Sequence, residues 1–389
     1  MLVSAAPRSY GTARIPYALA KAGFEVTLIA LRGSLAEKSS FLARVGHLPE
    51  YATKRQWLYA FGATVKAVAP RLVVPGDEIS LRLLQSIVVA PPADLRADLQ
   101  SEFAALVRAS LGEPTHYAST VDQTELPGLV ASLGIAVAPS VVTASDEEAA
   151  AFADSVGYPV VVRRRYTFVG QGVAVCNDRA ALGAAIASLG GASPFDLDDV
   201  GDNRVLVQAL PRGRRVHYSL AAWQGELVAG WAAETVVAEH GGSGATSVFR
   251  YHRSDELRAI AATLARELGL RGIAGVDCIL DADTGRPMFT ELARHVTPYS
   301  HRGASLGVDL CAALHASLGA TASAARSDLD AGEEGIGVHF PQEWLRDPYS
   351  DYLRNYPVDV PWEEPELIEA MLALRHEAWP NGEVPPPPS

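Results

Sequence analysis

The spacing of apolar residues at the start of the chain predicts a parallel β-sheet. Met1–Ala6 is an expected buried strand, a helix follows over Ala13–Ala22, and Phe24–Leu31 is an expected second strand. A strand, a helix and a strand within about thirty residues form a βαβ unit, in which the two strands lie parallel. Leu72–Val74 is expected to add a third short strand.

Three polar residues follow these predicted strands. Arg8 and Ser9 come after the first strand, and Glu78 comes after the third. In a parallel sheet the loops at the carboxyl ends of the strands face the ligand crevice, which makes all three candidates for substrate binding. The alternative is that they are ordinary turn residues.

The centre of the chain begins with two predicted helices. The first covers Thr120–Gly134, and the second begins at Ser145, whose hydroxyl and following acids form a capping signature, and ends near Val156. Further apolar runs predict three strands and an amphipathic helix, namely Val205–Leu210, Val216–Trp223, Glu226–Trp231 and Ser254–Leu268.

A cationic segment beside a pair of glycines suggests phosphate chemistry. The apolar strand Val160–Val162 runs into Arg163 and Arg165, and Gly170 and Gly172 precede the next strand. Guanidinium groups pair with phosphate oxygens, and a backbone without side chains can approach them closely. Taken alone, the glycines also fit a hairpin turn, and the arginines also fit a solvated strand edge.

Two later stretches are rich in turn residues. The glycine-rich loop Glu239–Gly244 contains Ser243, which is a candidate for contact with a phosphoryl group or substrate, with a plain connection as the alternative. Gly319–Gly335 is small, polar and acidic and fits a connection. The aromatic tail Ile336–Trp379 is expected to pack back on the body.

Two carboxylates stand on a predicted hairpin late in the chain. Val276–Leu280 and Pro287–Leu292 are expected strands, and the turn residues Asp281–Gly285 join them. This pairing can bring Asp277 and Glu291 to one end of one face. Two converging carboxylates suit Mg²⁺, which prefers hard oxygen ligands and is usually completed by nucleotide phosphates. Two exposed strand residues are the alternative.

Composition narrows the class of protein. A chain of 389 residues with 48% hydrophobic content is long enough for two or three domains. A net charge of −12 argues against nonspecific nucleic-acid binding. Three widely spaced cysteines suggest no disulfide framework, and no apolar run fits a signal peptide or a membrane span. A cytoplasmic protein without nucleic-acid or membrane partners is therefore expected.

The order of several short motifs resembles the ATP-grasp superfamily. The motifs are Gly134–Pro139, Gly157–Arg163, Gly170–Val173, Leu206–Gly213, Gly275–Asp277, Glu291 and Gly307–Leu310. Phe340–Trp344 and Asp359–Trp362 resemble the tails of carboxylate–amine ligase-like members. Each motif is short, and their order and spacing together carry the resemblance.

The resemblance implies a mixed α/β and α+β fold. An N-terminal parallel-sheet domain, called pre-ATP-grasp, would span residues 1–112. The two subdomains of the grasp would follow, with the lid at 113–204 and the metal and substrate site at 205–320. Residues 321–389 would form a C-terminal extension packing on the body.

The resemblance also implies a chemistry that uses ATP and Mg²⁺. Members of the superfamily transfer the γ-phosphoryl group of ATP to a carboxylate, and an amine or another nucleophile attacks the acyl phosphate. The implied partners are a small carboxylate, such as an amino acid or peptide precursor, and an amine. A homodimer is expected only by analogy.

Residue roles follow from the same resemblance. Arg163, Arg165, Gly170 and Gly172 would contact phosphate, Gln208, Ala209 and Leu210 would line the adenine hinge, and Asp277 and Glu291 would bind the metal. Arg294 and Arg302 are the catalytic candidates, and His301 could meet a substrate carboxylate, with a surface position as the alternative for His301 and Arg302.

The chain departs from the superfamily pattern at four positions. Gln123 and Arg163 stand where lysines are usual, Ala209 replaces the acid of the hinge strand, and Ala293 replaces an asparagine that binds metal. Two hypotheses follow. The protein is a divergent ATP-dependent ligase with a site rebuilt around arginines, or it is a degenerate relative that binds a small molecule or partner, or catalyses another reaction in the cleft.

Overall fold

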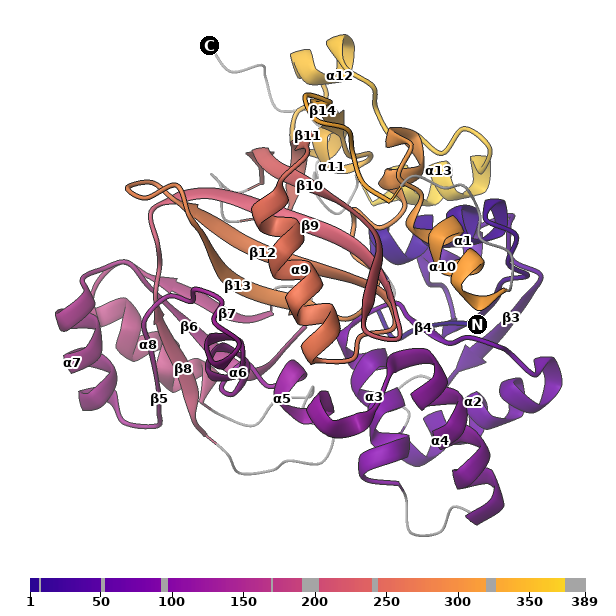
Figure 1. Ribbon diagram of the computed structural model, residues 1–389, viewed down its shortest axis with the longest axis horizontal. Helices are drawn as coiled ribbons and strands as arrows, with labels where there is room; N and C mark the ends of the chain where they lie inside the picture. The colour runs from indigo at the N-terminus through magenta and orange to yellow at the C-terminus, as the bar shows by residue number, and fades with distance from the viewer. Residues whose placement is uncertain are drawn as a thin grey trace.

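Three β-sheets organise the described part of the chain (Figure 1). The computed structural model describes residues 1–6, 8–49, 53–91, 97–168, 171–190, 203–239, 244–319 and 327–374. The three sheets have four, four and six strands, and helices pack on each of them. The predicted fold class, a parallel-sheet domain followed by antiparallel α+β parts, is confirmed.

The N-terminal sheet is parallel and has the strand order β3-β2-β1-β4. Its strands are β1 (Leu2–Ser4), β2 (Thr27–Leu31), β3 (Arg44–Leu48) and β4 (Val74–Pro75), and its helices are α1 (Tyr10–Lys21), α2 (Lys54–Val68), α3 (Glu78–Val89) and α4 (Ala97–Leu111). The sequence pattern did not predict β3, because this edge strand is largely exposed and alternates too few apolar residues to stand out.

The second sheet is antiparallel, with the order β5-β8-β6-β7. It contains β5 (Ser140–Thr143), β6 (Val160–Phe168), β7 (Gln171–Cys176) and β8 (Val205–Ala209), and α7 (Asp146–Val156) and α8 (Arg179–Leu189) pack on it. Ser145 caps α7 as predicted, by accepting a hydrogen bond from the Glu148 amide. We call this unit the lid; in Figure 1 it lies to the left of the largest sheet.

The helix predicted over Thr120–Gly134 is divided in two. The structure has α5 (Tyr117–Val121), preceded by the short η2 (Pro114–His116), and α6 (Leu126–Ser132). Asp122 separates them, because its carboxylate accepts hydrogen bonds from the amide and hydroxyl of Thr124 and so favours a turn.

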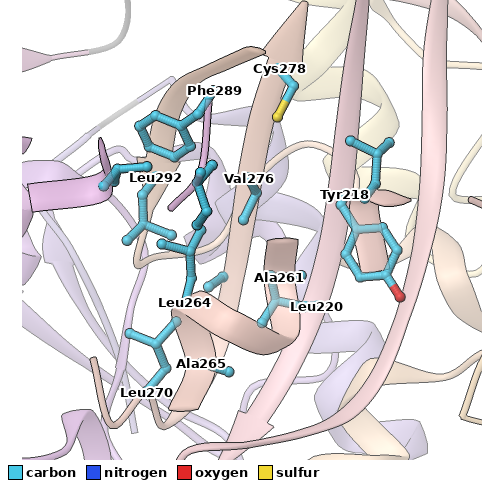
Figure 2. Close-up of a cluster of buried hydrophobic side chains, with 14 of the residues drawn as sticks. Tyr218, Leu220, Ala261, Leu264, Ala265, Leu270, Val276, Cys278, Phe289 and Leu292 are labelled. Carbon is cyan, nitrogen blue, oxygen red and sulfur yellow. The ribbon is translucent and has the colours of Figure 1, made fainter. Parts of the chain in front are cut away.

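The largest sheet has the order β13-β12-β9-β10-β11-β14. Its strands are β9 (Gly213–Trp223), β10 (Glu226–Ala238), β11 (Thr246–His252), β12 (Gly272–Asp281), β13 (Pro287–Ala293) and β14 (Gly335–Val338). Helix α9 (Asp255–Glu267), capped by Ser254 as predicted, covers one face and contributes Leu264 to the core shown in Figure 2. Helix α10 (Leu310–Leu318) packs against the other face.

The end of the described chain, residues 335–374, begins on the largest sheet and ends against α1, and we call it the C-terminal arm. It contains β14, α11 (Gln342–Arg346), α12 (Asp351–Asn355) and α13 (Pro365–Ala373). Leu367 and Met371 of α13 are fully buried in a cluster with Ala13 of α1 and Leu35 of η1 (Leu35–Lys38). The residue boundaries of the four predicted domains stay predictions.

Cys176, Cys278 and Cys311 are all buried and unpaired. Among the described residues, none of the helices has both the length and the apolar content that crossing a bilayer would require.

Candidate active site

Asp277 and Glu291 lie directly opposite each other on β12 and β13. Their sequence neighbours Val276 and Leu292 point into the core beneath α9 (Figure 2), so the two carboxylates project from the other face of the sheet. The side chain of Asp277 is 41% exposed and that of Glu291 is 35% exposed. The predicted convergence of these acids is confirmed, and we call them the acid pair.

A β-bulge produces this pairing. Cys278 pairs with Phe289, and the next pair is Asp277 with Glu291, so Thr290 is an extra residue on β13. Without it Asp277 would face Thr290, and Glu291 would turn toward the core. The outer edge of β13 is held at this point, because the Phe289 amide donates to the Ala136 carbonyl at 2.8 Å.

Asp277 is oriented by a buried histidine. His217 lies opposite Asp277 on β9, and its Nδ1 is 2.9 Å from Asp277 Oδ1. The imidazole is stacked on the Tyr299 ring with 4.3 Å between centroids. His217 was not among the predicted site residues, because only the alignment of β9 with β12 brings it to the acid.

Glu291 faces a cation from the lid. Arg163 of β6 places Nη1 3.8 Å from Glu291 Oε2. The pKa of Glu291 is raised, first by removal from bulk solvent and then by the carboxylates of Asp277 and Glu78, while Arg163 opposes these effects. Arg163, one of the predicted phosphate-binding residues, therefore meets the two predicted metal ligands at one place.

Contacts of the residues that follow Arg163 fix the position of β6. Arg165 Nε is 2.5 Å from Asp122 Oδ2, and the Gln123 amide donates to the Arg165 carbonyl at 2.8 Å. The Arg82 guanidinium of α3 lies 3.5 Å from the centroid of the Tyr166 ring. The lid strand thereby contacts the N-terminal part of the chain. Arg165 was predicted to bind cofactor, and here it pairs with a carboxylate.

Position 172 requires glycine, as expected of a backbone that approaches another group closely. Its φ is +86°, and a Cβ there would lie 2.7 Å from the Cγ and Cδ of Arg164. Arg164 extends away from the acid pair and donates to the Leu189 carbonyl. The candidates Gly170 and Ser243 lie outside the described residues.

The predicted hinge residues are at the end of β8. The Ala209 amide donates to the Pro139 carbonyl at 2.9 Å, and the Leu210 amide donates to the Pro159 carbonyl at 3.3 Å. Gln208 is buried, with Nε2 3.4 Å from the Ala138 carbonyl. These bonds connect the segment to the residues that precede β5 and β6. The adenine-binding role stays a prediction.

Arg294 is buried among structural partners. It donates to Thr120 Oγ1 at 2.9 Å and to the Leu111 carbonyl at 2.7 Å, and it lies 5.4 Å from the Tyr117 ring centroid. Burial lowers the pKa of its guanidinium to about 10. These contacts join the large sheet to the helices before the lid and do not support the predicted catalytic role.

His301 and Arg302 contact a carboxylate of the C-terminal arm. Arg302 Nη1 is 3.1 Å from Asp359 Oδ1, Arg14 Nη2 of α1 is 2.9 Å from the same oxygen, and His301 Nε2 bonds to Asp359 Oδ2. Arg302 begins η4 (Arg302–Leu306). The alternative of a surface position is wrong for both residues, because His301 and Arg302 are largely buried. We call these four residues the Asp359 cluster.

The electrostatics of this cluster are those of a fixed ion pair. Burial raises the pKa of Asp359, but His301, Arg302 and Arg14 outweigh it and hold that pKa well below its ordinary value. Burial lowers the pKa of His301, with Asp359 opposing. A substrate role for His301 or a catalytic role for Arg302 would require these groups to serve a second partner.

The three candidates from the N-terminal sheet occupy different settings. Ser9 is the N-cap of α1, and its hydroxyl oxygen accepts a hydrogen bond from the Thr12 amide at 3.2 Å, which is a helix-capping role. Arg8 is exposed. Glu78 begins α3 with an oxygen 3.8 Å from His295 Nε2, close enough to the acid pair to influence the pKa of Glu291.

The acid pair offers oxygen ligands of the kind that Mg²⁺ prefers. Asp277 Oδ1 accepts from His217, and Glu291 Oε2 faces Arg163. Among the described residues, no hydrogen bond or ion pair engages Asp277 Oδ2 or Glu291 Oε1, and these two oxygens could bind one cation. The donor set fits a divalent ion completed by phosphate oxygens, although the described residues contain no group of three metal-binding side chains.

Comparison with known proteins agrees with this geometry. A family model for the ATP-binding domain of the carbamoyl-phosphate synthase L chain matches residues 122–313. The biotin carboxylase domain dimer of Hydrogenobacter thermophilus 2-oxoglutarate carboxylase, solved with MgADP, ADP and bicarbonate, is similar with a TM-score of 0.62 and 14% identity. That match covers 86% of this chain and 73% of that chain.

Two further solved structures are similar. The L-amino acid ligase of Bacillus licheniformis has a TM-score of 0.58 and 13% identity, over 86% of this chain and 78% of that chain. The N5-carboxyaminoimidazole synthetase of Staphylococcus aureus, complexed with ADP, has a TM-score of 0.58 and 12% identity, over 86% and 80%. At such identities the likeness defines the fold: the chain has the ATP-grasp superfamily fold, as its motifs indicated.

Proposed function

We propose that this protein is an ATP-dependent ligase that joins a small carboxylate, an amino acid or peptide precursor, to an amine. The observation that carries the proposal is the acid pair, aligned across β12 and β13 with Arg163 3.8 Å from Glu291. The fold supports ATP-dependent activation of a carboxylate, and the amino acid ligase among the similar structures supports the substrate class.

The proposed reaction has two steps. A carboxylate oxygen of the acid attacks the γ-phosphorus of ATP, and the bond from that phosphorus to the bridging oxygen of ADP breaks. The amine nitrogen then attacks the acyl carbon, phosphate leaves with the electron pair of the carbon–oxygen bond, and the nitrogen loses a proton. Such transfers depend mainly on positioning and on neutralising phosphate charge.

The chain's own residues would divide these tasks. Asp277 and Glu291 would hold Mg²⁺, which when bound would draw charge from the phosphates. Arg163 would bring a guanidinium to the same place, Gly172 would let the lid backbone approach, and His217 would keep Asp277 oriented. Arg302 has no place in this scheme, because Asp359 already engages it.

A second candidate is a binding protein without turnover. The observation that favours it is that three predicted functional arginines have internal partners: Arg165 pairs with Asp122, Arg294 with Thr120, and Arg302 with Asp359. Such a protein would retain the scaffold and bind a small molecule or a partner in the cleft.

Product analysis separates the two candidates. We expect ADP and phosphate to appear when Mg-ATP is supplied with one acid from a panel of amino acids and with an amine, and hydroxylamine to trap the acyl phosphate as a hydroxamate. Asp277→Asn should reduce ADP release by about 10²–10³-fold, as loss of one charge-stabilising group does elsewhere. The matched control is Asp283→Asn, on the exposed turn of the same hairpin.

Binding without turnover would support the second candidate. In that case Mg-ATP or a panel acid would raise the melting temperature, as ligand linkage requires, while no ADP formed with any acid. A homodimer stays a prediction that light scattering can check.

A further inference from the structure

We propose that the acid pair binds one divalent ion rather than two, because Arg163 supplies a fixed positive charge at Glu291 in place of a second ion. The inference rests on the proposed function for the nucleotide phosphates that would complete the ion's coordination. Its central comparison needs only the metal alone.

The carboxylate oxygens set the first limit on the number of ions. Each acid has one oxygen already facing a protein donor or cation, Oδ1 of Asp277 at 2.9 Å from His217 and Oε2 of Glu291 at 3.8 Å from Arg163. One oxygen per acid remains. Mg²⁺ and Mn²⁺ commonly use one or two carboxylates together with phosphates and water, so the remaining pair suits a single ion.

Charge sets the second limit. Without nucleotide, the acid pair contributes two negative charges and Arg163 one positive charge, so one divalent ion already makes the group positive overall. A second ion would have to enter beside both the first ion and the guanidinium, and this repulsion grows as the distances shorten. Glu78 is a further acid that acts on Glu291, and it lies 3.8 Å from His295.

Arg163 is held where it is by the strand that carries it. Its side chain is only 13% exposed and its Nε is buried. The neighbouring residues of β6 are fixed by the Arg165–Asp122 pair at 2.5 Å and by Tyr166 against Arg82 at 3.5 Å. A guanidinium positioned by these contacts acts as a permanent cation, whereas a second metal ion would have to be recruited from solution.

Counting Mn²⁺ tests the inference. We expect electron paramagnetic resonance of free Mn²⁺ to show one ion bound per chain, both with Mn²⁺ alone and with ADP added. Arg163→Met removes the charge and keeps most of the side-chain volume. It should bind Mn²⁺ alone about tenfold more tightly, and in the presence of ADP it should bind two ions.

Two variants separate charge from strand structure. Arg163→Lys retains a cation and should still bind one Mn²⁺. Arg164→Met removes the adjacent arginine, which bonds to the Leu189 carbonyl, and should bind Mn²⁺ like the wild type. Two ions in the wild type, or equal Mn²⁺ affinity in the wild type and Arg163→Met, would overturn the inference.

The outcomes also distinguish this inference from the proposed function. If ADP and ATP leave Mn²⁺ binding unchanged and no ADP is ever released, the ligase proposal fails, while the comparison with Mn²⁺ alone still decides the role of Arg163. If Arg163→Met does not fold, Arg163→Gln takes its place as the variant without the charge, and two ions in the wild type would still overturn the inference.

Discussion

The acid pair and the Asp359 cluster both join carboxylates to arginines, but they differ in the exposure of the carboxylates and in the number of cations beside them. At the acid pair one guanidinium, that of Arg163, lies 3.8 Å from Glu291, and the side chains of Asp277 and Glu291 are 41% and 35% exposed. In the Asp359 cluster one carboxylate, 11% exposed, takes two guanidinium groups at 2.9 and 3.1 Å. The first group has negative charge and open oxygens to offer a ligand, and the second has neither.

The pKa directions express the same difference. The pKa of Glu291 is raised and that of Asp359 is lowered, although burial acts upward on both. Cations outweigh burial only in the Asp359 cluster. The fully paired charge of Asp359 joins α1, η4 and the C-terminal arm. The acid pair is incompletely neutralised, and functional sites are often found at charges of this kind. Arginines near a cleft are therefore poor indicators of a ligand site until their partners are known.

Removing the carboxylate of the Asp359 cluster should have the largest effect. Asp359→Ala leaves the buried Arg302 guanidinium without its carboxylate and leaves Arg14 with its longer contact to Glu364 at 3.5 Å, and we expect a loss of about 3–5 kcal/mol of unfolding free energy in urea. Asp351→Ala, at an exposed surface pair with Arg354, is the control and should cost no more than about 1 kcal/mol. Equal losses in both variants would contradict the description of this cluster as a structural ion pair.

Neutralising Glu291 of the acid pair should change stability less than Asp359→Ala does, and in the opposite direction. A carboxyl group whose pKa is raised on folding binds its proton more tightly in the folded state, so its ionisation weakens the fold as pH rises above the unfolded value of about 4.3. Glu291→Gln should therefore raise the melting temperature modestly at pH 7 and leave it nearly unchanged near pH 4. A lower melting temperature at pH 7 would show that the Arg163 pair dominates instead.

The pH dependence of the Asp359 cluster should run the other way. Its carboxyl pKa is lowered on folding, so its stabilisation is complete above about pH 4, the unfolded value, and is lost as pH falls further. We would measure the unfolding free energy of the wild type and of Asp359→Asn across this pH range. The difference between the two proteins should shrink only in acid, unlike the effect of Glu291→Gln.

Loosening the lid strand should give the smallest effect. Tyr166→Leu removes the ring against Arg82, an interaction worth about 0.5–1 kcal/mol, and we expect amide exchange in β6 to become a few times faster while global stability changes little. Tyr59→Leu removes a similar ring contact with Arg55 on the exposed side of α2 and should leave exchange in β6 unchanged. Unaltered exchange in both variants would mean that the ring contact does not hold the strand.

Sequence reasoning was most accurate where structure depends on neighbours along the chain. The caps at Ser145 and Ser254 and the hairpin turn at Asp281–Gly285 were all predicted, because a cap or a turn is made by hydrogen bonds over three or four residues. The ATP-grasp fold was also predicted, from the order of motifs along the chain. The strand β3 and the break at Asp122 were missed, since both depend on weak or competing local signals.

The sequence by itself determined which strands carry Asp277, Glu291 and Arg163. Only the tertiary structure decided that Thr290 bulges so that the acids face each other, that His217 orients Asp277, and that Asp359 engages Arg302. The physical reason is that a side chain's partner depends on register and on contacts between segments 57 or more residues apart, here with separations of 60 and 58 for His217–Asp277 and His301–Asp359. No local pattern specifies those, because shifting a strand by a single residue turns each of its side chains to the other face.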